Sequence, residues 1–162
     1  MMMPRFAQRS IILITVILSL ILAVMPMSIA VAAWRPEWPL LVTLYWIIAL
    51  PHRVNIGYAA VVGLAVDILL GSTLGFHAAA YAITAYPAAR YYQRIRNFSL
   101  SQQALLVALL VLIARVIVYL FEHYLNNAPL MWVYLWPALS SAIFWPWIFL
   151  VLRKLRRRFQ VQ

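Results

Sequence analysis

The sequence predicts an all-α protein: a polytopic integral membrane helical bundle with about six transmembrane helices. Only 10% of the 162 residues are charged and 67% are hydrophobic, whereas soluble globular chains carry about 25% charged residues. The apolar residues form long unbroken runs, and they do not alternate with polar ones as they would in the strands of a membrane barrel. We therefore expect residues 1–162 to form a single membrane domain.

Six apolar segments define the expected spans. They cover residues 11–31, 38–50, 54–71, 73–92, 105–121 and 131–152. The second is short, because its 13 residues cover only about 20 Å at 1.5 Å per residue, and the hydrocarbon layer is about 30 Å thick. We expect this segment either to borrow flanking residues or to be re-entrant inside the protein.

The first segment has some features of a signal peptide. Arg5 and Arg9 precede it, and Ala30-Val31-Ala32 is similar to a signal-peptidase site. The segment is 21 residues long, however, which exceeds the apolar region of an ordinary signal peptide. We interpret the segment as a retained helix.

The basic residues predict the orientation. If there are six spans and the N-terminus is inside, 11 of the 13 Lys and Arg residues lie on the inner side. These are Arg5, Arg9, Arg53, Arg90, Arg94, Arg96, Arg153, Lys154, Arg156, Arg157 and Arg158. We therefore expect both termini to be cytoplasmic. This placement accounts for the net charge of +10, so no nucleic-acid partner is predicted.

A basic cytoplasmic tail is predicted over residues 153–162, directly after the last span. Its charged residues are Arg153, Lys154, Arg156, Arg157 and Arg158. Basic residues in this position fix the topology of a membrane protein, and each contributes about 1 kcal/mol to contact with anionic lipids. We expect them to act as a topology or lipid anchor, which is also compatible with docking of a cytoplasmic partner.

From the third segment into the turn that follows it, every fourth position carries a small residue, with one carboxylate interrupting the series. The stripe consists of Ala59, Gly63, Asp67, Gly71 and Gly75. Helices approach closely along such stripes. We expect packing within the fold, and keep contact with a second chain as the alternative.

Asp67 is the only acid inside a predicted span, where a carboxylate costs about 2.5 to 3.5 kcal/mol near the membrane centre. We expect a structural pairing and not proton translocation, because no further acids form a relay. Arg115 lies at a similar predicted height in the fifth segment, so we hypothesise an Asp67–Arg115 pair. The alternatives are that Arg115 extends to the headgroups or binds Glu122 on its own helix face.

Nothing in the sequence indicates an enzyme, a metal site or a cofactor. The three histidines are scattered and lack the spacing of metal ligands, and the chain has no cysteine. Ser140 and Ser141 are not accompanied by an arranged base. We therefore predict no catalytic, cofactor-binding or metal-binding residues.

Four motifs together resemble the MreD family of rod-shape-determining proteins, in order, spacing and total length. They are Tyr45-Trp46, the block from Leu50 to Asn55 with Gly57, the block from Asp67 to Gly75 after Gly63, and the block from Trp145 to Leu150. The second and third blocks are fairly specific in combination, whereas an isolated Trp-Pro-Trp would be weak. Arg115 is not part of the family pattern.

The resemblance implies a non-enzymatic protein of the bacterial inner membrane. It implies direct binding to MreC and membership of a complex with MreB filaments, RodZ, RodA and its penicillin-binding transpeptidase. It also suggests a likeness to the substrate-binding subunits of energy-coupling-factor vitamin transporters, which is the alternative function. The alanine repeat of those subunits is replaced here by Thr15, Ser19, Ala23 and Met27.

Overall fold

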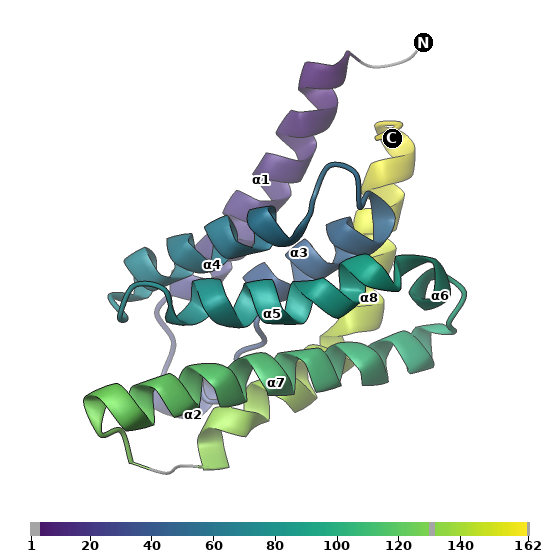
Figure 1. The fold of residues 1–162 in the computed structure, drawn as a ribbon. Coiled ribbons are helices and arrows are strands. Elements are labelled where there is room, and N and C mark those ends of the chain that lie inside the picture. The colour runs from purple at the N-terminus through teal and green to yellow at the C-terminus, as the bar shows by residue number, and fades with distance from the viewer. Residues whose placement is uncertain (1–3, 130–131, 162) are drawn as a thin grey trace.

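The computed structural model describes residues 4–129 and 132–161, which are mostly helical and contain no strand (Figure 1). The α-helices are α1 (Arg5–Val24), α2 (Ile29–Ala32), α3 (Trp38–Ala49), α4 (Ile56–Leu70), α5 (Phe76–Arg90), α6 (Tyr92–Arg96), α7 (Leu100–Asn126) and α8 (Trp136–Arg158), and the 3-10 turn η1 (Trp132–Leu135) precedes α8. The predicted all-α class is confirmed.

Helix α3 is the centre of the bundle. It packs against α1, α4, α5, α6 and α8, and every residue from Pro39 to Ala49 is buried. Its 12 residues span about 18 Å at 1.5 Å per residue. The second predicted segment is therefore short because neighbouring helices, and not lipid, surround it.

Helix α1 ends earlier than the first predicted segment, which extended to Val31. Pro26 follows the end of α1 and has no backbone N–H to continue the helix. The Arg35 guanidinium donates hydrogen bonds to the carbonyls of Ala23 and Met25, which helix termination leaves without helical partners. The chain then forms the short helix α2 before it enters α3.

Local signals fix the ends of α7. The Ser99 hydroxyl accepts from the backbone N–H of Gln102, whose side chain accepts from the backbone N–H of Ser99, so a complete capping box starts the helix. Asn127 ends it in the left-handed conformation, with φ of 54°.

Helix α8 differs from the prediction at its C-terminal end. It continues to Arg158, so the basic residues expected in a tail form its last turns. Because cations near a helix C-terminus offset the helix dipole, the basic composition supports this extension. Met131, where the sixth predicted span begins, lies outside the described residues.

Among the described residues, three stretches are long and apolar enough to cross a membrane: Arg5–Val24, Leu100–Asn126 and Trp132–Arg158. The other principal helices, α3, α4 and α5, have 12, 15 and 15 residues. Six principal helices thus lie near the six predicted segments, but a count of six complete spans stays a prediction.

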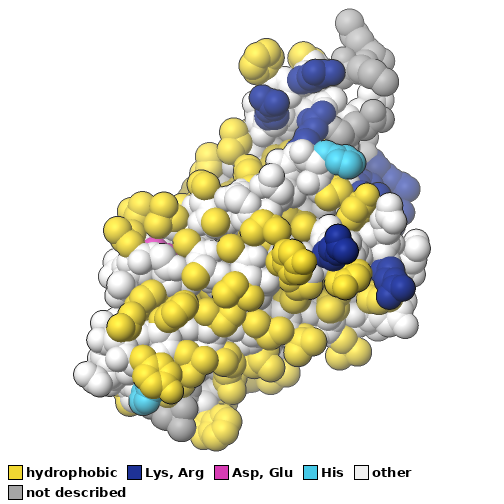
Figure 2. All heavy atoms as spheres, in the orientation of Figure 1, with side chains coloured by type: hydrophobic (Ala, Val, Ile, Leu, Met, Phe, Trp, Pro, Cys, Tyr) yellow, Lys and Arg dark blue, Asp and Glu magenta, His cyan; other side chains and the backbone are white. Residues whose placement is uncertain are grey.

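The start of α1 and the end of α8 lie at the same end of the bundle (Figure 1). The Gln8 side chain donates to the carbonyl of Gln160 at 3.3 Å. Lys and Arg side chains gather around this end, which we call the basic end, while hydrophobic side chains cover much of the remaining visible face (Figure 2). We call the opposite end the far end.

Candidate functional site

The buried carboxylate of Asp67 organises the turn between α4 and α5. It is completely buried. Its Oδ1 accepts from the Ser72 hydroxyl at 2.8 Å and from the His77 ring and backbone N–H at 2.8 and 3.1 Å. Its Oδ2 accepts from the backbone N–H groups of Gly75 and Ala78 at 3.0 and 3.4 Å. A carboxylate that faces only donors is well satisfied, which explains how this acid is accommodated inside the bundle.

The stripe of small residues divides into two parts. Ala59, Gly63 and Asp67 are buried, and a Cβ on Gly63 would lie 2.5 Å from the His77 carbonyl oxygen of α5. Gly71 and Gly75 instead flank the turn with φ of 65° and 99°, and a Cβ on either would meet no atom within 4 Å. The first part packs within the fold, and the second provides backbone conformations that favour glycine.

Glu37 is the centre of a second polar cluster, at the far end. Its Oε1 accepts from Arg115 Nη1 at 2.7 Å and its Oε2 accepts from the Tyr81 hydroxyl at 3.0 Å. Its backbone N–H donates to the Ser141 hydroxyl at 3.1 Å. Arg115 also donates through Nε to the carbonyl of Tyr134 at 3.1 Å. One residue before α3 thus connects α5, α7 and α8.

The hypothesised Asp67–Arg115 pair is wrong. Donors from the start of α5 already occupy Asp67, and Arg115 forms its ion pair with Glu37. The competing partner Glu122 does not bind Arg115 in the part of the chain that the structure describes. A small cavity of about 170 Å³, lined in part by Arg35, Glu37 and Arg115, lies beside the ion pair.

A lateral apolar groove separates α1 from α8, with α3 as its floor. It encloses about 250 Å³. Leu18 and Leu22 of α1 form one wall, and Trp147 and Val151 of α8 form the other. These four side chains are between 39% and 61% exposed. An open apolar groove on the side of a membrane bundle can receive side chains of a neighbouring helix.

Several polar side chains of the described helices are engaged in hydrogen bonds within and between helices. Thr15 and Ser19 donate to carbonyls of their own helix, and Ser140 does the same in α8. Within residues 4–129 and 132–161, no three His, Cys, Asp or Glu side chains come together as a metal site. What the arrangement does chemically is fix the positions of helices.

These features define the class: a membrane protein built as a helical bundle, with polar clusters that hold its helices and a lateral apolar groove. Residues 3–155 match the family described as rod shape-determining protein MreD. The chain is also 39% identical, over 142 residues, to the rod shape-determining protein MreD of Haemophilus influenzae, in an alignment that covers 88% of each chain. The chain therefore belongs to the MreD family of rod shape-determining proteins.

No solved structure matches the chain. The family match and the named relative give no support to the vitamin-transporter alternative.

Proposed function

We propose that this chain is a non-enzymatic component of the cell-wall elongation machinery in the bacterial inner membrane. In this proposal it binds MreC directly and helps couple MreB filaments to peptidoglycan synthesis, in one complex with RodZ, RodA and its penicillin-binding transpeptidase. The support comes from the family and from a relative named as rod shape-determining. The structural observation that carries the proposal is the open groove between α1 and α8.

The groove suits a protein partner better than a small polar substrate. Its lining is almost entirely apolar, with Trp38 and Val42 of α3 at the floor. Helix α1 packs on α3 and α4, and α8 packs on α3 and α7, so α3 supports both walls and each wall has one further neighbour of its own. Because lipid solvates apolar helices as well as protein does, a partner gains affinity in a membrane chiefly from close packing. A groove provides such packing, and we propose it as the contact with MreC.

Replacing Leu18 by tryptophan should fill the groove and weaken MreC binding about tenfold, because an overpacked contact costs about 1–3 kcal/mol. The measurement is the amount of MreC that co-purifies after mild detergent extraction. Leu109→Trp on α7 is the matched control, since Leu18 and Leu109 are 54% and 53% exposed and only Leu18 lines the groove. Equal MreC recovery with both variants would exclude the groove, and a vitamin co-purifying in place of MreC would exclude the proposed function.

A second proposal concerns orientation: both termini are cytoplasmic. Its support is the basic end, where the two chain ends meet (Figures 1 and 2), because basic residues are retained on the cytoplasmic side of membranes. A reporter that works only in the cytoplasm should therefore be active when it is fused after Phe159, and a reporter that works only outside the cytoplasm should be inactive there. Activity of a reporter that works only outside the cytoplasm would show that the C-terminal end is external and would contradict the proposed orientation.

A further inference from the structure

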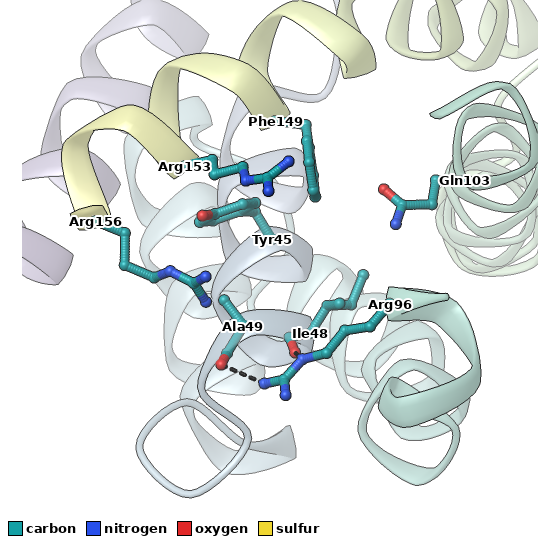
Figure 3. Close-up of a pocket in the computed structure, with 8 residues that line it drawn as sticks. All are labelled: Tyr45, Ile48, Ala49, Arg96, Gln103, Phe149, Arg153 and Arg156. Carbon is teal, nitrogen blue, oxygen red and sulfur yellow. Dashed lines mark hydrogen bonds between the residues drawn. The ribbon is translucent and has the colours of Figure 1, made fainter. Parts of the chain in front are cut away.

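A second cavity lies at the basic end and has a different lining from the groove. It encloses about 260 Å³ between α3, α6, α7 and α8. Three arginines line it, Arg96, Arg153 and Arg156, together with Tyr45, Gln103 and the apolar residues Ile48, Ala49 and Phe149. Arg153 and Arg156 reach in from α8, and Arg96 reaches in from the opposite side (Figure 3). The cavity is several times larger than the roughly 30 Å³ that one water occupies in the liquid.

No acidic side chain of the described residues lines the cavity to balance its three arginines. Glu37, Asp67 and Glu122 are the chain's three acids, and none of them lines the cavity. Arg96 is partly engaged, because its Nε and Nη2 donate to the carbonyls of Ile48 and Ala49 at 2.8 and 2.5 Å, where α3 ends. It thereby offsets the negative end of the α3 dipole, which is equivalent to about half an elementary charge.

Arg153 and Arg156 are the cations that remain to bind a ligand. Neither forms an ion pair or a hydrogen bond with another described residue. Two guanidinium groups that face one cavity present paired N–H donors, which match the oxygens of a phosphate group.

The surroundings favour a phosphate that is attached to a lipid. Leu150 lies three residues before Arg153 and therefore on the same face of α8. Leu150 is 52% exposed, and Ile143, seven residues earlier on the same face, is 72% exposed. A phosphate held at Arg153 would therefore leave its acyl chains along an exposed apolar helix face, and a free phosphate would make no use of that face. Figure 3 shows Phe149 and Arg153 side by side above Tyr45.

We infer that the cavity formed by Tyr45, Arg96, Arg153 and Arg156 is a binding site for the phosphate of an anionic phospholipid. The site is more specific than the basic anchor predicted from the sequence, because it uses two of the five cations of α8 and adds Arg96 from α6. It does not depend on MreC binding. The proposed orientation decides only that the lipid belongs to the cytoplasmic leaflet.

The test compares two double variants with the same change in net charge. Arg153→Gln with Arg156→Gln removes the free cations of the cavity, while Arg157→Gln with Arg158→Gln removes two exposed cations of the same helix turn that do not line it. Native mass spectrometry of the purified full chain, titrated with phosphatidylglycerol, measures the apparent Kd. We expect the first pair to raise it roughly tenfold to thirtyfold, at about 1 kcal/mol per arginine, and the second pair to raise it less than twofold.

Several outcomes would overturn the inference. Equal losses for both pairs would mean a diffuse basic surface, and equally tight binding of phosphatidylcholine would mean that anionic charge is not recognised. Displacement of the lipid by inorganic phosphate at similar concentrations would mean a site for free phosphate. Unchanged lipid binding with loss of MreC would mean that an acidic protein segment binds there.

Thermal unfolding without added lipid is the control for correct folding. Both double variants should unfold like the unaltered protein, because the replaced side chains make no bonds to other described residues. If the glutamine pair does not fold, Arg153→Lys with Arg156→Lys gives the same comparison. Lysine keeps the charge but loses the paired N–H geometry, so we expect a smaller rise in Kd, about threefold to tenfold.

Discussion

Replacing Gly63 by alanine is expected to lower the free energy of unfolding by about 1–3 kcal/mol, and replacing it by leucine should lower it further. The reason is the close approach of α5. The added Cβ would lie 2.5 Å from the His77 carbonyl oxygen, 2.6 Å from its carbonyl carbon and 2.7 Å from Ala78 Cα. All three are backbone atoms, so α5 itself has to move. Thermal unfolding in detergent measures the loss, and rod shape in cells reports its consequence.

Gly57 provides a matched control for Gly63, because it lies in the same helix. Its added Cβ would come no closer than 3.4 Å, to the Asn55 side chain. Gly57→Ala should therefore be neutral or stabilise the protein by up to about 1 kcal/mol, since alanine is the better helix former. If Gly63→Ala behaved like Gly57→Ala, the close contact between α4 and α5 would be disproved.

Replacing Asp67 by asparagine is expected to lower the free energy of unfolding by about 3 kcal/mol, although the two side chains have nearly the same shape. Both carboxylate oxygens face donors. In asparagine one oxygen becomes an NH₂ group, which would then point at N–H groups and find no acceptor. Thermal unfolding of the purified variant gives the change.

Glu122→Gln is the matched control for Asp67→Asn, because it removes the same charge from an acid whose side chain binds no other described residue. Its effect should stay below about 0.5 kcal/mol. Double-mutant cycles then identify the partner of Asp67. We expect strong coupling of Asp67→Asn with His77→Ala and weak coupling with Arg115→Gln; the reverse order would contradict the arrangement of the α4–α5 turn.

The sequence predicted the helical class and the approximate place of each principal helix. Long apolar runs determine these features directly, because backbone groups inside a membrane must be satisfied within the segment itself. The run from 11 to 31 was the main error in boundaries, since apolar composition continues past Pro26 while the helix does not. Composition likewise could not place the last turns of α8, because a basic sequence is compatible with either a helix or a tail.

The polar partners were harder to predict, because height along a helix does not determine which neighbour a side chain faces. Asp67 and Arg115 were compared by depth alone, but the turn after α4 brings the first N–H groups of α5 back to Asp67. His77 was considered only as a metal ligand. Its position ten residues after Asp67, across a glycine-rich turn, was a usable signal that the two could meet.

Glu37 lies between the first two predicted spans, and no partner was predicted for it. The available signal was its position immediately before the apolar helix α3, in a chain with only three acids. An isolated acid beside a membrane helix requires a cation or donors, and Arg115 is the isolated cation of α7. Pairing the few acids with the isolated cation by opposite charge would have favoured Glu37–Arg115 as strongly as the comparison of depths favoured Asp67–Arg115.

The burial of α3 has a consequence for biosynthesis. Trp46 of α3 binds Thr15 of α1, a helix that is synthesised before α3. Tyr45 and Trp38 of α3 contact Phe149 and Phe144 of α8, the helix that is synthesised last. The ribosome therefore completes the central helix α3 long before it completes α8, which packs against α3. Until α8 is inserted, Tyr45 and Trp38 lack their aromatic partners, so α3 reaches its final burial only when synthesis is nearly complete.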